Sequence, residues 1–140
     1  MITYIDTSSL LKLLIEEDGS DRAGLIWDTA DALVSVALIV VEGLAALAAA
    51  RRGRRLSVSQ HQRAVDEFSA LVAELAIVEV TADLITNAAD FAEDEGLRGY
   101  DAVHLAAALS VEATVLSSAD AELCEAAERC GLHVANPLDP

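Results

Sequence analysis

The 140-residue chain has little of what builds disulfide frameworks or zinc sites. It holds two cysteines, Cys124 and Cys130, which are too few for a disulfide scaffold and whose spacing of six matches no metal motif. No HxxxH, CxxC or Ser–His–Asp arrangement occurs, so the usual signatures of zinc and acyl-transfer chemistry are absent. We expect both cysteines to pack as reduced thiols.

Basic residues are also scarce. Nine Lys and Arg stand against 24 Asp and Glu, which gives a formal net charge of −15. Lys12 is the single lysine, and five of the nine basic residues fall within residues 51–63. The net charge therefore argues against nucleic-acid binding, and only a local cluster of basic residues could support it.

Targeting signals are missing as well. The start "MITYIDTSS" has no basic region followed by an apolar run, so we expect a cytoplasmic protein. Residues 32–50 are apolar enough to raise the alternative of a membrane span. Glu42 near the middle of this run and its β-branched first half favour a short buried strand that leads into a helix, and we expect no membrane association.

The rest of the chain alternates between short apolar runs and amphipathic segments. With 54% hydrophobic residues it is not disordered. The pattern predicts a single domain over residues 1–140, an α/β three-layer sandwich with a mainly parallel sheet flanked by helices. Ser20 and Thr81 are predicted N-caps, and Gly53 and Gly96 are predicted helix ends. Strands are predicted at 2–5, 33–36, 76–80, 113–117 and 132–136, and helices at 7–17, 19–30, 37–53, 57–75, 81–96, 101–109 and 118–131.

Four acidic residues stand where a carboxylate is costly or unexpected. Asp6 ends the first strand, and Asp120 closely follows the strand 113–117. Asp101 opens a helix that is apolar apart from His104, and Glu42 lies inside another apolar helix. If these acids converge, each pair repels by about 3 kcal/mol at 5 Å and an effective dielectric of 20. A hard divalent cation, Mg²⁺ or Mn²⁺, is the neutralising group that fits oxygen ligands.

Three of the four acids also have an ordinary structural interpretation, and Glu42 does not. Asp6 and Asp120 are also typical helix N-caps, and Asp101 suits the first turn of a helix because of the helix dipole. Glu42 has no capping role in the middle of a helix. His104 lies one turn from Asp101, and we expect a core histidine with a backbone hydrogen-bond partner.

Taken in order, "YIDTSSLLKLL", the Glu in "SVALIVVEGLAAL", "GLRGYDAVHLAAAL" and "TVLSSADAELCEAA" resemble the PIN-domain family. More narrowly they resemble the VapC-type toxins of bacterial toxin–antitoxin pairs, over essentially the whole chain. The resemblance implies a PIN fold and a Mg²⁺- or Mn²⁺-dependent endoribonuclease. The family's acidic residues fall on Asp6, Glu42, Asp101 and Asp120, and its small hydroxyl residue falls on Ser118.

On this resemblance, Asp6, Glu42 and Asp101 are metal ligands, Asp120 holds a metal-bound water or a second ion, and Ser118 orients its neighbours. The implied partners are an RNA substrate and a small cognate antitoxin, and we expect a homodimer. An acidic pocket suits a basic segment of the antitoxin, and Leu10, Leu13 and Leu14 offer an apolar face, unless they are simply core. The arginines at 51, 52, 54 and 55 either contact phosphate or form a solvated helix end.

Other functions stay open. A PIN nuclease of RNA processing would need no antitoxin. A metal-dependent phosphohydrolase is disfavoured because "DTSS" lacks the second Asp of the DxDx(T/V) pattern. A nucleotide-binding module is disfavoured because neither GxGxxG nor GxxxxGK[ST] occurs. The complete acidic set argues against a non-catalytic interaction domain.

Overall fold

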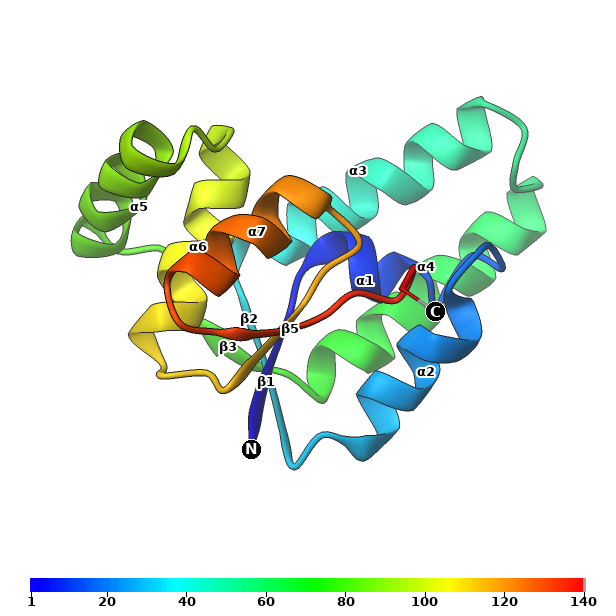
Figure 1. The fold of residues 1–140 in the computed structure, drawn as a ribbon. Helices are drawn as coiled ribbons and strands as arrows, with labels where there is room; N and C mark the ends of the chain where they lie inside the picture. The colour runs from blue at the N-terminus through cyan, green and yellow to red at the C-terminus, as the bar shows by residue number, and fades with distance from the viewer. Residues whose placement is uncertain (140) are drawn as a thin grey trace.

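The computed structural model describes residues 1–139. A five-stranded, all-parallel sheet in the order β3-β2-β1-β4-β5 is flanked by helices on both faces (Figure 1). The predicted three-layer α/β sandwich is confirmed. In chain order the elements are β1 (Ile2–Ile5), α1 (Thr7–Leu11), α2 (Ser20–Thr29), β2 (Ala32–Val36), α3 (Leu38–Arg52), α4 (Val58–Ala73), β3 (Ala76–Val78), α5 (Ala82–Glu95), α6 (Gly99–Ser110), β4 (Val115–Ser117), α7 (Ala121–Arg129) and β5 (His133–Ala135).

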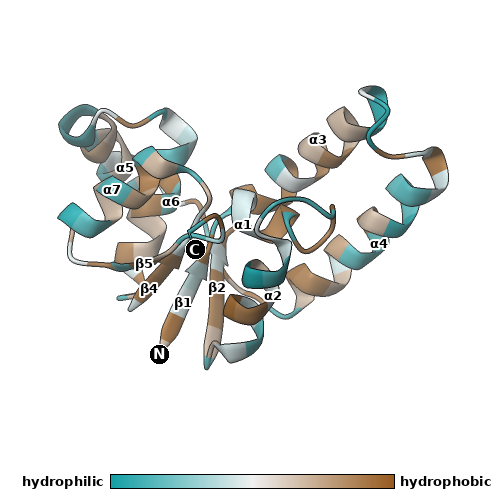
Figure 2. Cartoon of the chain, turned by 45° about the vertical axis from the view of Figure 1, so that its right-hand side comes forward, coloured by the Kyte–Doolittle hydropathy of each residue, from teal (hydrophilic) through white to brown (hydrophobic). Residues whose placement is uncertain are grey.

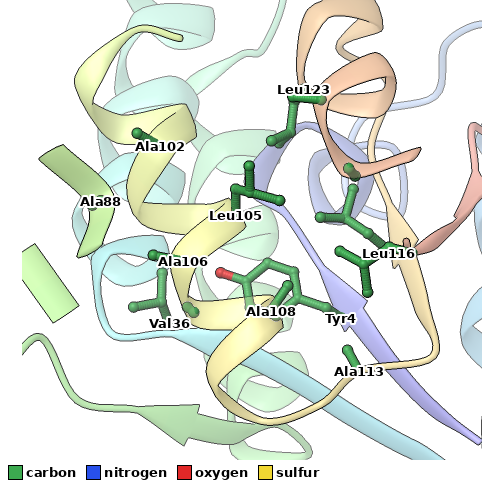
Figure 3. Packing of buried hydrophobic residues seen from close by; sticks show 14 of the residues in the cluster. Tyr4, Val36, Ala88, Ala102, Leu105, Ala106, Ala108, Ala113, Leu116 and Leu123 are labelled. Carbon is green, nitrogen blue, oxygen red and sulfur yellow. The ribbon is translucent and has the colours of Figure 1, made fainter. Parts of the chain in front are cut away.

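Each face of the sheet has its own hydrophobic core. On one face, Tyr4 and Leu116 pack against Leu105 and other apolar residues of α5, α6 and α7 (Figure 3). On the other face, Ile5 packs with residues of α1 to α4, Phe68 among them. Successive residues of β1 thus point to opposite faces, as the pleat of a strand requires. The strands are mainly apolar because both of their faces are covered (Figure 2).

Helices α3 and α4 pack against each other as a hairpin that projects from the sheet (Figures 1 and 2). A side chain at Gly43 of α3 would collide with the ring of Phe68 on α4. The absence of a side chain at this position lets the two helices approach closely. This contact fixes the part of α3 that carries Glu42.

Three of the four predicted helix caps are confirmed, whereas the cap at Ser20 and the end of the helix predicted over 7–17 are wrong; the helix predicted over 118–131 is shorter and runs over Ala121–Arg129. Thr81 caps α5, Gly96 ends it in the left-handed conformation, and Gly53 ends α3. The helix predicted over 7–17 ends at Leu11, and the following Lys12 is buried with its ammonium bonded to Glu17 and to the carbonyl of Asp18. The cap of α2 is Gly19, with φ of 88°, and not Ser20.

Within residues 1–139 the structure contains no helix that is both long and apolar enough to cross a membrane. The apolar run at residues 32–50 is divided between β2 and α3, as its composition favours.

The chain order places a topological switch at the centre of the sheet. From β1 the chain proceeds outward through β2 to β3, and it then returns to form β4 on the other side of β1. Ligands of open parallel sheets bind beyond the carboxyl ends of the strands at such a switch. Asp6 directly follows β1, and Ser118 and Asp120 follow β4, so these side chains stand at the switch.

Candidate active site

A cavity of about 280 Å³ opens at the carboxyl edge of the sheet. All four predicted acids line it, although they come from four separate segments of the chain. The complete lining consists of Asp6, Thr7, Ser8, Leu11, Glu42, Ala46, Arg98, Tyr100, Asp101, His104 and Asp120. The structure thus brings the predicted set together in one pocket.

Asp6 is buried and held by hydroxyl groups. Its Oδ1 accepts hydrogen bonds from the backbone N–H of Ser9 (3.0 Å) and the hydroxyl of Ser8 (2.8 Å), so it does cap α1. Its Oδ2 accepts from Ser118 Oγ at 2.7 Å. Ser118 Oγ in turn accepts from the backbone N–H of Asp120 at 3.0 Å, which couples the loop after β4 to Asp6. Capping and a role in the pocket are therefore compatible for this carboxylate.

Glu42 is held by a buried histidine. Its Oε1 accepts from Thr7 Oγ1 at 2.8 Å and pairs with His104 Nε2 at 2.7 Å. The other ring nitrogen, Nδ1, pairs with the hydroxyl of Tyr4 at 2.8 Å. Because an ionised carboxylate can only accept, Nε2 of His104 is the donor in its hydrogen bond to Glu42. The expected backbone partner of His104 is thus wrong: its partners are two side chains from distant elements.

Asp101 and Asp120 share one cation. Arg98 donates from Nη2 to Asp120 Oδ2 at 3.0 Å, and from Nε and Nη2 to Asp101 Oδ2 at 3.3 Å each. Asp120 also caps α7, with Oδ1 accepting from the N–H of Leu123 at 3.0 Å. Both acids lie in first-turn or cap positions of their helices, as their ordinary interpretation expects, and both still face the pocket.

Burial dominates the electrostatics of two of these acids. It raises the pKa of Asp6 even though Ser118, Ser9 and His104 oppose the shift. Burial and the charge of Asp120 raise the pKa of Asp101 against the opposing effect of Arg98. At Glu42, burial is outweighed by the hydrogen bond and charge of His104, so the pKa of Glu42 is lowered. Neutralising the charge is therefore favourable at Asp6 and Asp101, whereas the surroundings of Glu42 favour its charged form.

The donor set suits a hard divalent cation, because carboxylate oxygens and hydroxyls are the ligands that Mg²⁺ and Mn²⁺ prefer. In the arrangement that the structure describes over residues 1–139, no three Asp, Glu, His or Cys side chains are spaced to hold a metal ion. Several oxygens of these acids are already engaged by groups of the protein. Arg98 spans the outer pair of acids, and His104 and Thr7 engage Oε1 of Glu42.

Other predicted residues lie away from the pocket. Leu10 is fully buried in the core and cannot contact a partner, whereas Leu13 and Leu14 are half-buried. The arginines at 51, 52, 54 and 55 are exposed at the far end of α3. The helix rises by about 15 Å over the ten steps from Glu42 to Arg52.

Cys124 and Cys130 are free thiols, and burial raises the pKa of Cys124 to about 12.

Sequence reasoning missed Arg98, Thr7 and Ser8 and gave His104 the wrong partners. One signal was available for Arg98, because an Arg three residues before an Asp at a helix start predicts an ion pair. Thr7 and Ser8 are hydroxyl residues directly after Asp6, in position to bond a neighbouring carboxylate. The partners of His104 gave no signal, because Tyr4 and Glu42 are 100 and 62 residues away in sequence.

Comparison with known families agrees with this geometry. The sequence model of the PIN domain matches residues 3–129. The chain therefore belongs to the PIN-domain family. Two relatives from Mycobacterium tuberculosis, Ribonuclease VapC45 of strain CDC 1551 / Oshkosh and Ribonuclease VapC49 of strain ATCC 25618 / H37Rv, are each 39% identical over 142 residues, covering 99% of both chains. Within the family, the chain is thus a VapC-type PIN domain.

Solved structures share the fold of this PIN domain. FitAcB from Neisseria gonorrhoeae superimposes with a TM-score of 0.73 at 17% identity and covers 100% of both chains. VapC20 of Mycobacterium tuberculosis, described as a Sarcin-Ricin loop cleaving toxin, has a TM-score of 0.70 at 17% identity and covers 93% of this chain and 95% of its own. At such low identity these similarities establish the fold alone.

Proposed function

We propose that this PIN domain is a metal-dependent endoribonuclease that hydrolyses RNA phosphodiester bonds as the toxin of a toxin–antitoxin pair. The observation that carries the proposal is the convergence of Asp6, Glu42, Asp101 and Asp120 on one pocket at the switch point of the sheet. The two ribonucleases at 39% identity over the full length support the same chemistry.

Mg²⁺, or Mn²⁺ in its place, would be held by Asp6, Glu42 and Asp101, with Asp120 as a further ligand or a partner of a coordinated water. A bound divalent cation supplies charge neutralisation at the phosphoryl group and lowers the pKa of a water ligand. The chain itself keeps the ligands in place: Ser118 and Ser9 orient Asp6, and His104 orients Glu42. The same hydrogen bonds favour the deprotonated form of both carboxylates, which at Asp6 offsets part of the effect of burial.

Metal dependence can be tested with a labelled RNA and purified protein. Cleavage is expected with Mg²⁺ or Mn²⁺ and none is expected in EDTA, with activity restored when excess metal is added back. Cleavage in EDTA at the rate seen with metal would contradict the metal mechanism. Hydrolysis of a small phosphomonoester without cleavage of RNA would instead support the phosphohydrolase alternative.

We propose a small antitoxin as the partner. Solved relatives include the VapBC2 complex of Rickettsia felis and a toxin–antitoxin complex from Klebsiella pneumoniae. On this chain, Leu13 lines a hollow of about 470 Å³ with Trp27 and Leu71, and Leu14 lines a second of about 360 Å³. Apolar side chains of a partner segment would fit these hollows, and a basic residue would fit the acidic pocket.

Co-expression with the product of the adjacent small gene, followed by pull-down, tests this partner. Leu13→Glu should weaken the complex, whereas Leu25→Glu on the exposed side of α2 should leave it intact. A stable complex that cleaves RNA at the rate of the free protein would contradict inhibition at the pocket. Absence of any complex would favour the PIN nuclease that acts without an antitoxin.

The homodimer also stays a prediction, which light scattering of the purified protein tests.

A further inference from the structure

Arg98 is the one arginine or lysine among the described residues that line the pocket. It is the N-cap residue of α6, but its side chain makes no cap hydrogen bond. Instead the guanidinium reaches across the pocket and contacts Oδ2 of both Asp101 and Asp120. These two oxygens belong to carboxylates that the proposed function assigns to a metal.

The two halves of the pocket differ in how their charge is balanced. Asp6 and Glu42 accept hydrogen bonds from hydroxyl groups and, at Glu42, from the buried ring of His104, all of which the fold holds in place. Asp101 and Asp120 are instead balanced by a full positive charge, which occupies the same oxygens that a metal would use. A guanidinium and a divalent cation repel each other and cannot share these oxygens.

Arg98 can leave its place without disturbing the core. Its side chain is 59% exposed, and its other recorded contact is with the ring of Tyr100, 5.0 Å from Cζ to the ring centroid. The side chains that it joins are 6% and 25% exposed and stay fixed by their helices. The movement therefore costs little beyond the two ion pairs.

We infer that Arg98 is an internal counter-ion that bridges Asp101 and Asp120 in the metal-free protein and that a divalent cation replaces. The inference rests on the proposed function, because it requires metal binding at these acids. It accounts for the position of the Arg98 guanidinium in a pocket that all four acids line. Arg98 is thus a positioning residue that stabilises the empty pocket and lowers the affinity for metal.

Direct measurement of Mn²⁺ binding, without RNA, tests this role. The dissociation constant should be measured by electron paramagnetic resonance of free Mn²⁺ for wild type, Arg98→Gln and Arg129→Gln. Arg129 is the matched control, because it is also about half-exposed and pairs with one acid, Glu95, outside the pocket. We expect Arg98→Gln to bind Mn²⁺ about tenfold more tightly, from loss of cation–cation repulsion, and Arg129→Gln to be unchanged.

Each outcome separates this inference from the proposed function. Equal or weaker Mn²⁺ binding by Arg98→Gln, with normal binding by wild type, would overturn the counter-ion role and leave the metal site standing. Absence of Mn²⁺ binding in all three proteins would overturn the metal site itself, and the inference with it. A second readout is the melting temperature in EDTA, which should fall for Arg98→Gln and recover in Arg98→Gln/Asp120→Asn. No recovery in the double variant would also overturn the counter-ion role.

Discussion

The two halves of the pocket stabilise their carboxylates in different ways. In the half formed by β1, α1 and α3, hydroxyl groups bond Asp6 and Glu42, and the buried His104 connects Glu42 to the core through Tyr4. In the half formed by α6 and the loop after β4, one exposed arginine balances Asp101 and Asp120. The first half is therefore preorganised by the fold, and the second is adjustable. The predictions below test this contrast.

The largest expected effect is on catalysis. Asp101→Asn should lower RNA cleavage by about 100-fold or more, because it removes the charge of a proposed metal ligand. The fold should be kept, since burial already raises the pKa of Asp101 and so favours its neutral form. Single-turnover cleavage assays and circular dichroism give the two readouts.

Asp83→Asn is the matched control for this variant, because Asp83 is an exposed first-turn acid of α5. It should cleave at the wild-type rate. An Asp101→Asn protein that cleaves as fast as this control, or that is unfolded when the control is folded, would show that Asp101 has been assigned the wrong role.

The second largest expected effect is a loss of stability when the preorganised half of the pocket, which holds Asp6 and Glu42, is disrupted. His104→Leu should lower the free energy of unfolding by about 2–4 kcal/mol, because it removes the partner of the Tyr4 hydroxyl and one of the two hydrogen bonds that Oε1 of Glu42 accepts. His133→Leu, at an exposed position of β5, should change it by less than about 0.5 kcal/mol. Urea unfolding in EDTA measures both, and equal stabilities of the two variants would contradict the role of this network.

Disrupting the packing of α3 against α4 should have a smaller effect on the free energy of unfolding. Gly43→Ala should lower the free energy of unfolding by about 1–3 kcal/mol, because the new methyl group meets the ring of Phe68. Gly99→Ala is the control, since no atom lies within 4 Å of a methyl group at that position. A Gly43→Ala protein as stable as wild type would mean that the close approach of α3 and α4 is not needed.

The smallest effect is in the pH dependence of stability in EDTA. The folded state raises the pKa of Asp6, so the stability linked to this group is present at low pH and is lost as pH rises through the folded pKa. Asp6→Asn should therefore gain stability relative to wild type as pH rises above about 4. Glu42→Gln should show the opposite trend, because the pKa of Glu42 is lowered. The same sign for both variants would contradict the assigned electrostatics.

The fold and the four acids could be predicted from sequence, because both follow from local patterns. Alternating apolar runs predict parallel strands, and acids placed after strands predict a site at their carboxyl ends. The contacts of His104 could not be predicted, because they depend on where three distant elements meet. The early end of α1 was also missed, because the helical pattern of leucines continues to Leu14 and the long-range packing of this segment leaves no local signal.

The capping and metal-ligand interpretations of Asp6 and Asp120 need not compete. Each uses Oδ1 to cap a helix and turns Oδ2 toward a partner in or beside the pocket. Sequence patterns describe the first role and leave the second oxygen unassigned. Only the arrangement of several segments shows that these oxygens face one cavity.

The most direct test of the account is a Mn²⁺-soaked crystal of the wild-type protein, examined for anomalous scattering. We predict a peak in the pocket that is coordinated by carboxylates from both halves, Asp6 or Glu42 together with Asp101, with the guanidinium of Arg98 displaced from Asp101. A fully occupied peak elsewhere on the molecule, or a pocket without metal and with Arg98 still bridging Asp101 and Asp120 at saturating Mn²⁺, would contradict it.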